Sequence, residues 1–190
     1  MPDVRNYAVE ETLKNGLPAT VRAIRPDDKS RIVAAFKELE PHSIYSRFFQ
    51  HKRELSAAEL QRITEVDFAN EIALVVTIRQ GAREMIIGSG RYVVYAAPDG
   101  IPSAEIAFIV EETYHGQGVA SRLLRHLTQI AREKGLRRFT AEMLPGNQSM
   151  LAVFTHSGLP QETKRSVDAV QTTLMLDHPD PQGGGLLPDG

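Results

Sequence analysis

Residues 103–143 hold the pattern that most limits how this chain can fold. A strand-like run, SAEIAFIV, leads through a turn with two glycines into an amphipathic helix expected from about Gln117 to Lys134, and a second strand-like run, RRFTAEM, follows. The apolar positions of this helix recur every three or four residues, at Val119, Leu123, Leu124, Leu127, Ile130 and Ala131, and Gly135 ends it. Two strands of one sheet that are joined by such a crossover run parallel. The segment therefore predicts one parallel strand pair.

The segments before residue 103 predict antiparallel structure and helices. Asn15-Gly16 separates two strand-like runs and is typical of a tight hairpin turn. Residues 71–110 contain three β-branched runs divided by turn sequences, which predict a meander. Between the hairpin and the meander we expect three helices: one that starts at Pro26-Asp27-Asp28, one in 43–50 and one in 55–64. Ser56 followed by Glu59 predicts a capping box for the last of these.

The end of the chain completes the predicted fold. A short helix in 147–158 and an alternating strand in 166–176 follow the crossover unit. The expected fold class is α+β, with a mixed and mostly antiparallel sheet flanked by helices. We expect one domain over residues 1–177, in which 1–16 supply the first strand of the hairpin. Residues 178–190 are rich in proline and glycine and predict a disordered tail.

The composition excludes several kinds of partner. The net charge of −2 gives no global field toward nucleic acid or an anionic membrane. The chain has no cysteine, which excludes disulfides and thiolate metal sites and fits a reducing cytoplasm. It shows neither a signal peptide nor the ~18 consecutive apolar residues of a spanning helix. The six histidines lack metal-ligand spacing, and His126 is expected on the surface of the long helix. We therefore expect a cytoplasmic protein without a metal, nucleic acid or membrane partner.

The glycine turn predicts an anion site. The first turn of a helix leaves N–H groups unpaired, and the helix dipole adds roughly half a positive charge there. A diphosphate binds well at such an end when no side chain blocks its approach. Gly116, Gly118 and Ala120 keep this turn open. The structural alternative, a helix start that carries glycines without a ligand, is costly because glycine destabilises the helix.

Two nucleotide-binding patterns fit this turn poorly. A P-loop requires a lysine followed by serine or threonine after its last glycine, and the turn has no such lysine. A dinucleotide fingerprint requires a third glycine where this chain has Ser121. It also requires a tight turn, whereas the five residues EETYH separate the strand from Gly116.

The run YHGQGVASRLL resembles the pyrophosphate loop of the GNAT acyl-CoA N-acyltransferase superfamily. That loop reads Gln/Arg-x-x-Gly-x-Gly/Ala, and His115 stands here in its first position. The resemblance implies the GNAT fold, with the parallel strand pair at the cofactor site and acetyl-CoA as co-substrate. It also implies a set of cofactor-binding residues in this loop: His115, Gly116, Gln117, Gly118, Val119, Ala120 and Ser121.

A narrower resemblance covers much of the remaining chain. The segments SIYSRFF, LSAAELQRITEVDFANEIALV, SAEIAFIV and MLPGNQSML together resemble the GNAT domain of bacterial protein lysine acetyltransferases of the Pat type. In that group the domain can be fused to an acyl-CoA synthetase-like or cyclic-nucleotide-binding domain. This chain has room for neither, so a stand-alone form is expected.

Glu105 is the candidate general base. A lysine ammonium, with a pKa near 10.4, costs about 4–5 kcal/mol to deprotonate at pH 7, so amine acylation needs a group that takes the proton. Glu105 lies on the strand that runs into the glycine turn, and alternation places it on one face with Ala107 and Ile109. The Pat resemblance gives a glutamate at this position the same role. The alternative is an ordinary carboxylate on a solvent-facing strand surface.

The same strand is expected to serve the cofactor. Main-chain groups of Phe108, Ile109 and Val110 can pair with the amides of pantetheine, and one N–H can stabilise the acyl oxygen. The resemblance assigns Asn147 to the pantetheine arm. Phe154 stands where many GNAT enzymes carry a tyrosine that protonates the departing thiolate, a difference that Pat-type proteins tend to share.

Three functions remain open on this basis. The first is acetyl-CoA-dependent acetylation of a protein lysine, a metabolic enzyme being one candidate acceptor, by direct attack in a ternary complex. The second is acetylation of a small amine. The third is an acyl-CoA sensor without turnover, which Phe154 favours. Glu65 and Asp67 could attract an acceptor lysine, but a solvated helix end is the favoured interpretation. A monomer and a homodimer are both compatible with the sequence.

Overall fold

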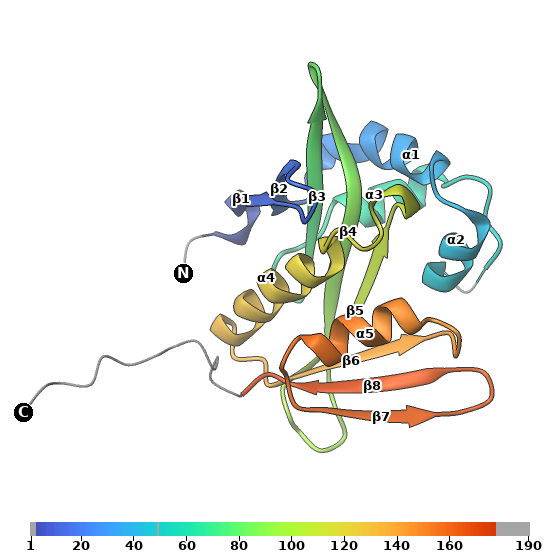
Figure 1. Cartoon of the computed structure of the whole chain (residues 1–190). Helices are drawn as coiled ribbons and strands as arrows, with labels where there is room; N and C mark the ends of the chain where they lie inside the picture. The colour runs from blue at the N-terminus through green and yellow to red at the C-terminus, as the bar shows by residue number, and fades with distance from the viewer. Residues whose placement is uncertain (1–2, 49, 178–190) are drawn as a thin grey trace, which may run out of the picture.

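The strands of the protein form one mixed sheet. The structure is a computed structural model that describes residues 3–48 and 50–177. The sheet has eight strands in the order β1-β2-β3-β4-β5-β6-β8-β7 (Figure 1). Their bounds are β1 Ala8–Thr12, β2 Pro18–Ala23, β3 Glu71–Gln80, β4 Arg83–Tyr95, β5 Ser103–Val110, β6 Arg138–Met143, β7 Gln161–Arg165 and β8 Val170–Met175.

The helices cover both faces of this sheet. The α-helices are α1 Lys29–Lys37, α2 Pro41–Phe48, α3 Ala57–Thr64, α4 Val119–Glu133 and α5 Gln148–His156, and short 3-10 turns lie at Val4–Asn6, Pro26–Asp28 and Glu112–Tyr114. In Figure 1, α4 crosses the front of β3, β4 and β5, with α5 below it, whereas α1 and α3 lie behind β4. Each face therefore has its own apolar layer.

The larger core lies under α4. Leu123, Leu127 and Ile130 of α4 are fully buried or nearly so against Ile106 of β5 and Phe139 of β6. The smaller core lies under α1 and α3 and includes Ile24, Ile32, Val75 and Ile86. Because strand residues alternate between faces, β5 contributes Ala104, Ile106 and Phe108 to the first layer and turns Glu105, Ala107 and Ile109 to the second.

The meander positions the start of α4. β3, β4 and β5 pair antiparallel, and the β3–β4 register shifts between Val76 and Thr77 so that Ile87 is the extra residue. Gly88 follows this residue directly. A Cβ on Gly88 would lie 2.7 Å from Cγ1 of Val119, the first residue of α4. Glycine at this position therefore lets the N-terminus of α4 rest on the sheet.

The single parallel pair is short. β5 and β6 are in register only at Ser103, Ala104 and Glu105, which face Arg138, Phe139 and Thr140. Beyond Glu105, β6 stays paired with β8 as far as Met143, whereas β5 continues to Val110 without a β6 partner. The two strands therefore diverge and leave one edge of β5 open over its last residues.

Most predicted elements are present. The hairpin around Gly16, the three early helices, the capping box of Ser56 with Glu59, the meander and the parallel pair all form. The long helix begins at Val119, two residues later than expected, because Gly118 adopts a left-handed conformation and caps it. Sequence reasoning missed β7, since QETKR has no apolar alternation and forms only the edge of the sheet. The predicted tail, 178–190, lies outside the described residues.

A buried ion pair fastens α1 to the sheet. Arg22 of β2 donates to both carboxylate oxygens of Asp28 at 2.8 Å, and Asp28 is fully buried. Burial alone would raise the pKa of Asp28. Hydrogen bonds from the Arg22 side chain and the Arg25 N–H outweigh this effect, and the positive charges of Arg22 and Arg31 add to them. The pKa of Asp28 is therefore below its usual range. This carboxylate therefore stabilises the folded state in its ionised form.

We expect Asp28→Asn to lower the free energy of unfolding by about 3 kcal/mol, because the change removes the carboxylate that binds buried Arg22 through two hydrogen bonds and leaves Glu84 as its remaining charged partner. Urea unfolding at pH 7 measures this loss, and Asp27→Asn is the matched control, since the Asp27 side chain is 73% exposed. The folded-state pKa of Asp28 is lowered, so its contribution is complete above the unfolded pKa of about 3.9 and disappears as the pH falls below it. Equal stability of the two variants would contradict this account.

Candidate functional site

The glycine turn and the first turn of α4 form an anion-binding end. Gly116 and Gly118 have positive φ angles of 76° and 82°, and Gly118 is the N-cap residue. A Cβ on Gly116 would meet no atom within 4 Å, so the turn is open on that side. Among the predicted loop residues, His115, Gly116 and Ser121 are exposed, Gln117, Gly118 and Ala120 are half-buried, and Val119 is buried.

No side chain caps α4. The first hydrogen bond of the helix is donated by the Arg122 N–H to the oxygen of the N-cap residue, Gly118, at 3.1 Å. The N–H groups before Arg122 therefore have no partner within the helix. Ser56 caps α3 and Asn147 caps α5 with side-chain oxygens, but α4 has neither a side-chain cap nor an acidic residue in its first turn. The donors of this helix end are therefore available to an external anion.

The N-terminal hairpin is fastened to the same turn. The Lys14 N–H donates to the Gln117 oxygen at 3.2 Å, and the Arg122 guanidinium donates to the oxygens of Gly118, at 3.0 Å, and Thr12. The Lys14 side chain lies beside Gly118, with Cε 3.6 Å from the place where a Cβ would stand. Sequence reasoning missed both basic residues, because neither belongs to the loop pattern and Lys14 is brought there only by the sheet.

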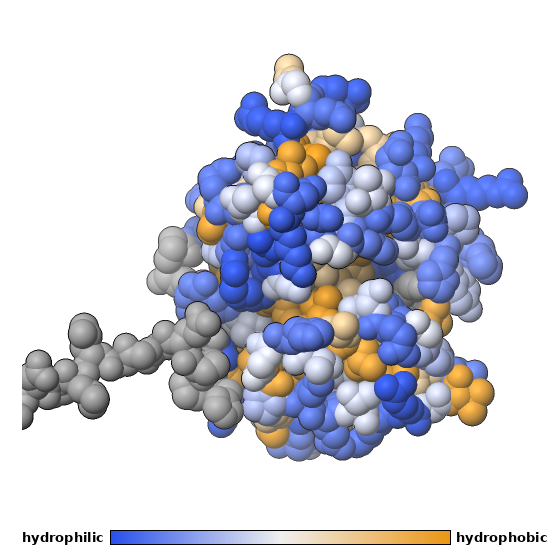
Figure 2. Space-filling model, in the orientation of Figure 1, coloured by the Kyte–Doolittle hydropathy of each residue, from blue (hydrophilic) through white to orange (hydrophobic). Residues whose placement is uncertain are grey.

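The open edge of β5 begins where this turn ends. The Glu111 N–H donates to Ile87 of β4, at 2.9 Å, so by alternation Ile109 also directs its main-chain groups to β4. Phe108 and Val110 direct theirs to the side from which β6 has diverged. Of the three residues expected to meet pantetheine, these two therefore have the suitable main-chain orientation. In Figure 2, apolar surface is visible across the middle of this face, between more hydrophilic regions.

His115 closes the loop onto this edge. Its Nε2 lies 2.9 Å from the Val110 oxygen, which joins the loop to the end of β5. His115 stands where the loop pattern has glutamine or arginine, and it thus has a structural partner on β5, the candidate cofactor strand. The resemblance alone gives no reason for this contact.

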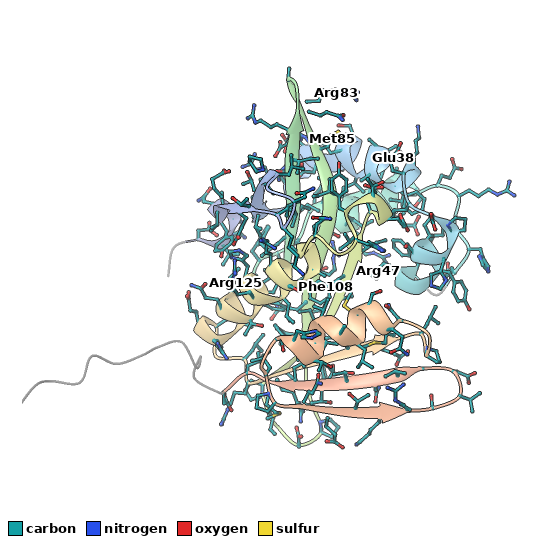
Figure 3. All side chains as sticks on the ribbon, viewed as in Figure 1. Glu38, Arg47, Arg83, Met85, Phe108 and Arg125 are labelled. Atoms are coloured by element: carbon teal, nitrogen blue, oxygen red, sulfur yellow. The ribbon has the colours of Figure 1, made fainter. Side chains whose placement is uncertain are left out.

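Three other predicted residues lie around the diverging strands. Asn147 caps α5, and its Oδ1 accepts from the Met150 N–H at 3.1 Å. Phe154 is fully buried and its ring lies 6.2 Å from that of Phe108 (labelled in Figure 3), so it supports β5 from within the core. Ile109 turns its side chain to the opposite face, where it lines a cavity.

Glu105 lies exposed on that opposite face. Its neighbours across the sheet are Val93 of β4 and Thr140 of β6, and Val93 is 44% exposed. The expected alternation of β5 is confirmed, because Ala104 and Ile106 are buried while Glu105 is solvent-accessible. A carboxylate at the last paired position before the strands diverge can take a proton from an amine that approaches the gap.

The two acidic residues after α3 have structural roles. Glu65 accepts from Lys29 at 2.6 Å, and Asp67 accepts from the N–H groups of Ala69, Asn70 and Glu71 at 2.9 Å each. Backbone N–H groups, that of Glu71 first, lower the pKa of Asp67. The favoured interpretation of a helix end therefore agrees with their contacts.

The expectation for His126 is wrong. His126 is only 6% exposed, its Nδ1 lies 2.5 Å from the Tyr7 hydroxyl, and its Nε2 lies 2.8 Å from Glu11. Burial lowers its pKa, against the opposing effect of the Glu11 carboxylate. The prediction failed because these partners lie in and beside β1, more than a hundred residues earlier in the sequence.

The described part of the chain offers neither a metal cluster nor a membrane-spanning helix. Over 3–48 and 50–177, no group of three or more histidine, cysteine, aspartate or glutamate side chains is arranged to hold a metal ion. Within the same residues, no helix combines the length and the apolar character required to cross a bilayer.

Comparison with known sequences identifies a family. The family described as "Acetyltransferase (GNAT) domain" matches residues 19–160. The chain is 27% identical over 140 residues to Acetyltransferase PA5475 of Pseudomonas aeruginosa, covering 74% of each protein. It is 31% identical over 138 residues to Acetyltransferase Pat of Mycolicibacterium smegmatis, and this match spans 73% of the chain but 40% of that relative.

Comparison with solved structures agrees with the fold. The GNAT domain of S. lividans PAT superposes with a TM-score of 0.78 at 35% identity, covering 88% of this chain and 96% of that one. YncA from Salmonella typhimurium, described as a putative acetyltransferase with its cofactor acetyl-CoA, superposes with a TM-score of 0.64 at 17% identity, covering 87% and 99%. The latter match supports the fold alone.

We expect Gly118→Ala to weaken the binding of coenzyme A about tenfold. A residue with a Cβ pays about 1–2 kcal/mol in the left-handed conformation, and the methyl group would also displace the Arg122 guanidinium. Gly135→Ala is the matched control, because Gly135 has the same φ of 82° at the other end of α4 with nothing within 4 Å of the new Cβ. Isothermal titration calorimetry of both variants makes the comparison, and an equal loss of affinity would refute a ligand role for the turn.

Proposed function

Because the chain belongs to the GNAT acetyltransferase family and is thus an acetyl-CoA-dependent N-acetyltransferase, we propose that its acceptor is a lysine side chain of a protein and that Glu105 is the general base. The observation that carries this proposal is the position of Glu105 at the point where β5 and β6 diverge, between an open strand edge and an exposed face. The Pat proteins among its relatives support the protein acceptor.

The chain offers groups for each part of the cofactor. The unpaired N–H groups at the start of α4, with Gly116 and Gly118 leaving room, would hold the pyrophosphate. Main-chain groups of Phe108 and the N–H of Val110, whose oxygen already contacts His115, would pair with the pantetheine amides like an added strand. Lys14 lies close enough to the turn to add a positive charge. Acetyl-CoA, when bound in this way, supplies the acyl group and a thiolate leaving group.

The reaction requires the removal of two protons from the nitrogen and one displacement. Glu105 takes the first proton from the lysine ammonium, and the neutral nitrogen forms a bond to the acetyl carbon while the bond from that carbon to sulfur breaks. The nitrogen releases its second proton to solvent as the amide forms. An N–H on the open edge of β5 stabilises the charge that develops on the acyl oxygen. The coenzyme A thiolate, whose conjugate thiol has an ordinary pKa of about 8.5, takes its proton from solvent, because Phe154 is buried and carries no hydroxyl.

We expect Glu105→Gln to lower kcat by about 10²–10⁴-fold and to leave the Kd of acetyl-CoA unchanged, because only proton removal is affected. Release of free coenzyme A at saturating acetyl-CoA measures kcat, and calorimetry measures binding. Glu162→Gln on β7 is the control, since Glu162 is exposed and remote in the strand order. Unchanged turnover in Glu105→Gln would remove Glu105 from the mechanism.

The acceptor class has a separate test. Mass spectrometry of a lysate incubated with the protein and acetyl-CoA should reveal newly acetylated protein lysines, and a parallel panel of free amines should give little coenzyme A release. Turnover confined to free amines would replace the protein acceptor with a small molecule. Tight acetyl-CoA binding without any acceptor-dependent release would indicate a sensor.

A further inference from the structure

A cavity on the Glu105 side of the sheet contains two arginines. It has a volume of about 80 Å³ and lies between α1, α2 and α3 and the strands β4 and β5. Most of its lining is apolar, from residues such as Phe36, Phe48, Leu55 and Ile109. Arg47 of α2 and Arg91 of β4 also line it, and Figure 3 labels Arg47 between α2 and β5.

Only one of these arginines is compensated by close partners. Arg91 donates to Glu71 at 2.6 Å and to the Ile63 oxygen at 2.7 Å. Within the described residues, Arg47 makes no hydrogen bond or ion pair, and its guanidinium carbon lies 5.3 Å from the centre of the neighbouring Phe48 ring. Arg47 is half-buried, and a guanidinium that is removed from water in part without an anionic partner is energetically costly.

The carboxylates near Arg47 act on its charge from a distance and make no hydrogen bond or ion pair with it among the described residues. Burial first, and then the like charge of Arg91, lower the pKa of Arg47 to about 10, against the opposing effects of the Glu105 and Glu71 carboxylates. Arg47 therefore remains protonated at neutral pH. Glu71 is bonded to Arg91, and Glu111, which also lines the cavity, accepts the Thr113 N–H at 3.1 Å.

Glu105 lies on the same face as this cavity. Arg91 is directly opposite Ala107, so Glu105 is its diagonal neighbour on β5, within reach of a long side chain. Ile109, which shares this face with Glu105, belongs to the lining. An acceptor that presents its amine to Glu105 therefore has the Arg47 guanidinium within reach of an adjacent group.

We propose that the acceptor carries a carboxylate close to its reactive amine and that Arg47 binds this carboxylate in the cavity. The planar guanidinium can donate two parallel hydrogen bonds to a carboxylate, and such a pair is strongest where water is excluded. An acceptor without the carboxylate leaves half-buried Arg47 without an anionic partner, so the site discriminates against it. This inference rests on the proposed acetyltransferase function and specifies the substrate class of the same site.

Two sources can supply such a carboxylate. One is an aspartate or glutamate that flanks the acceptor lysine in a protein, and the other is the carboxylate of a free amino acid. Matched acceptor pairs distinguish them. The first pair is a lysine peptide with a flanking glutamate and the same peptide with glutamine. The second pair is free lysine and lysine amide.

The experiment measures kcat/KM for these four acceptors at saturating acetyl-CoA. It uses the full chain as wild type, Arg47→Gln, Arg47→Lys and the control Arg83→Gln. Figure 3 labels Arg83 at the far tip of the β3–β4 hairpin, where its side chain is exposed. Thermal unfolding of each variant shows whether it retains the fold.

We expect wild type to prefer the carboxylate member of one pair about tenfold or more, mainly through KM. Arg47→Gln should remove this preference and retain turnover of the neutral member. Arg47→Lys should retain part of the preference, because it keeps the charge but not the two parallel hydrogen bonds. Arg83→Gln should behave as wild type. The pair that shows the preference identifies the source of the carboxylate.

Two outcomes would overturn the inference. Equal kcat/KM of wild type for both members of each pair would exclude a carboxylate site, and this result does not depend on whether any variant folds. An equal loss for all acceptors in Arg47→Gln would mean that Arg47 acts on Glu105 or on the fold instead. Either outcome leaves the acetyltransferase activity intact, since that activity fails only if wild type turns over no amine. The protein acceptor fails by a different result, turnover confined to free amines.

Discussion

The short pairing of β5 with β6 is the constraint on which the candidate site depends. Three residues of β5 are in register with β6, and then the strands separate while β6 remains held by β8. The main-chain groups of Phe108 and Val110 consequently lack a partner strand, although β5 is central in the sheet. An unpaired edge inside a sheet is costly for a protein that folds only for stability. It is useful when an extended ligand such as pantetheine completes it.

The crossover helix α4 places its N-terminus, the expected anion site, beside the open edge of β5. Since α4 connects β5 to the parallel strand β6, it must cross the sheet, and its N-terminus must lie near the end of β5. Gly88 lets Val119 approach β4, and the contact of His115 with Val110 joins the loop to the strand. The chain then leaves this helix end without the side-chain cap that α3 and α5 possess.

A polar network between β1 and α4 holds the start of α4 in place. Glu11 near the end of β1 meets His126, Arg122 and Arg125 of α4, and the His126 ring also meets Tyr7. Burial would raise the pKa of Glu11, but the hydrogen bonds from His126 and Arg125 lower it, so the carboxylate is ionised in the folded state. Because Arg122 also holds Gly118, this network connects the N-terminal hairpin with the turn that precedes α4.

Local sequence patterns were sufficient to predict the helices and strands that show a regular apolar spacing or a known capping or turn sequence. The apolar spacing of α4, the alternation of β5 and the capping box of Ser56 are all present as expected. The contacts that join distant segments were not accessible in this way. His126 gave no sign of burial, Lys14 gave no sign of its place beside Gly118, and Arg47 gave no sign of its cavity, because each depends on the strand order rather than on its neighbours in sequence. The fold and the position of the glycine turn before α4 were therefore predictable from the sequence. The residues that surround this turn, and the cavity on the Glu105 face of the sheet, were not.

The two faces of β5 divide the proposed reaction. Phe108 directs its side chain to the α4 face and its main chain to the open edge, so the cofactor side is built from backbone groups over an apolar support. Glu105 and Ile109 direct their side chains to the other face, where the lining of the cavity includes two arginines and the carboxylate of Glu111. Main-chain groups suit a ligand that stays the same, because they are present whatever side chain the residue carries. Side chains suit a ligand that differs from one protein to another, because they change with the sequence. A single strand can therefore hold the same acyl donor throughout a family while its opposite face selects the acceptor. In this chain the guanidinium of Arg47 lines the cavity on that face and has no hydrogen bond or ion pair among the described residues, so it is the feature through which such selection would act.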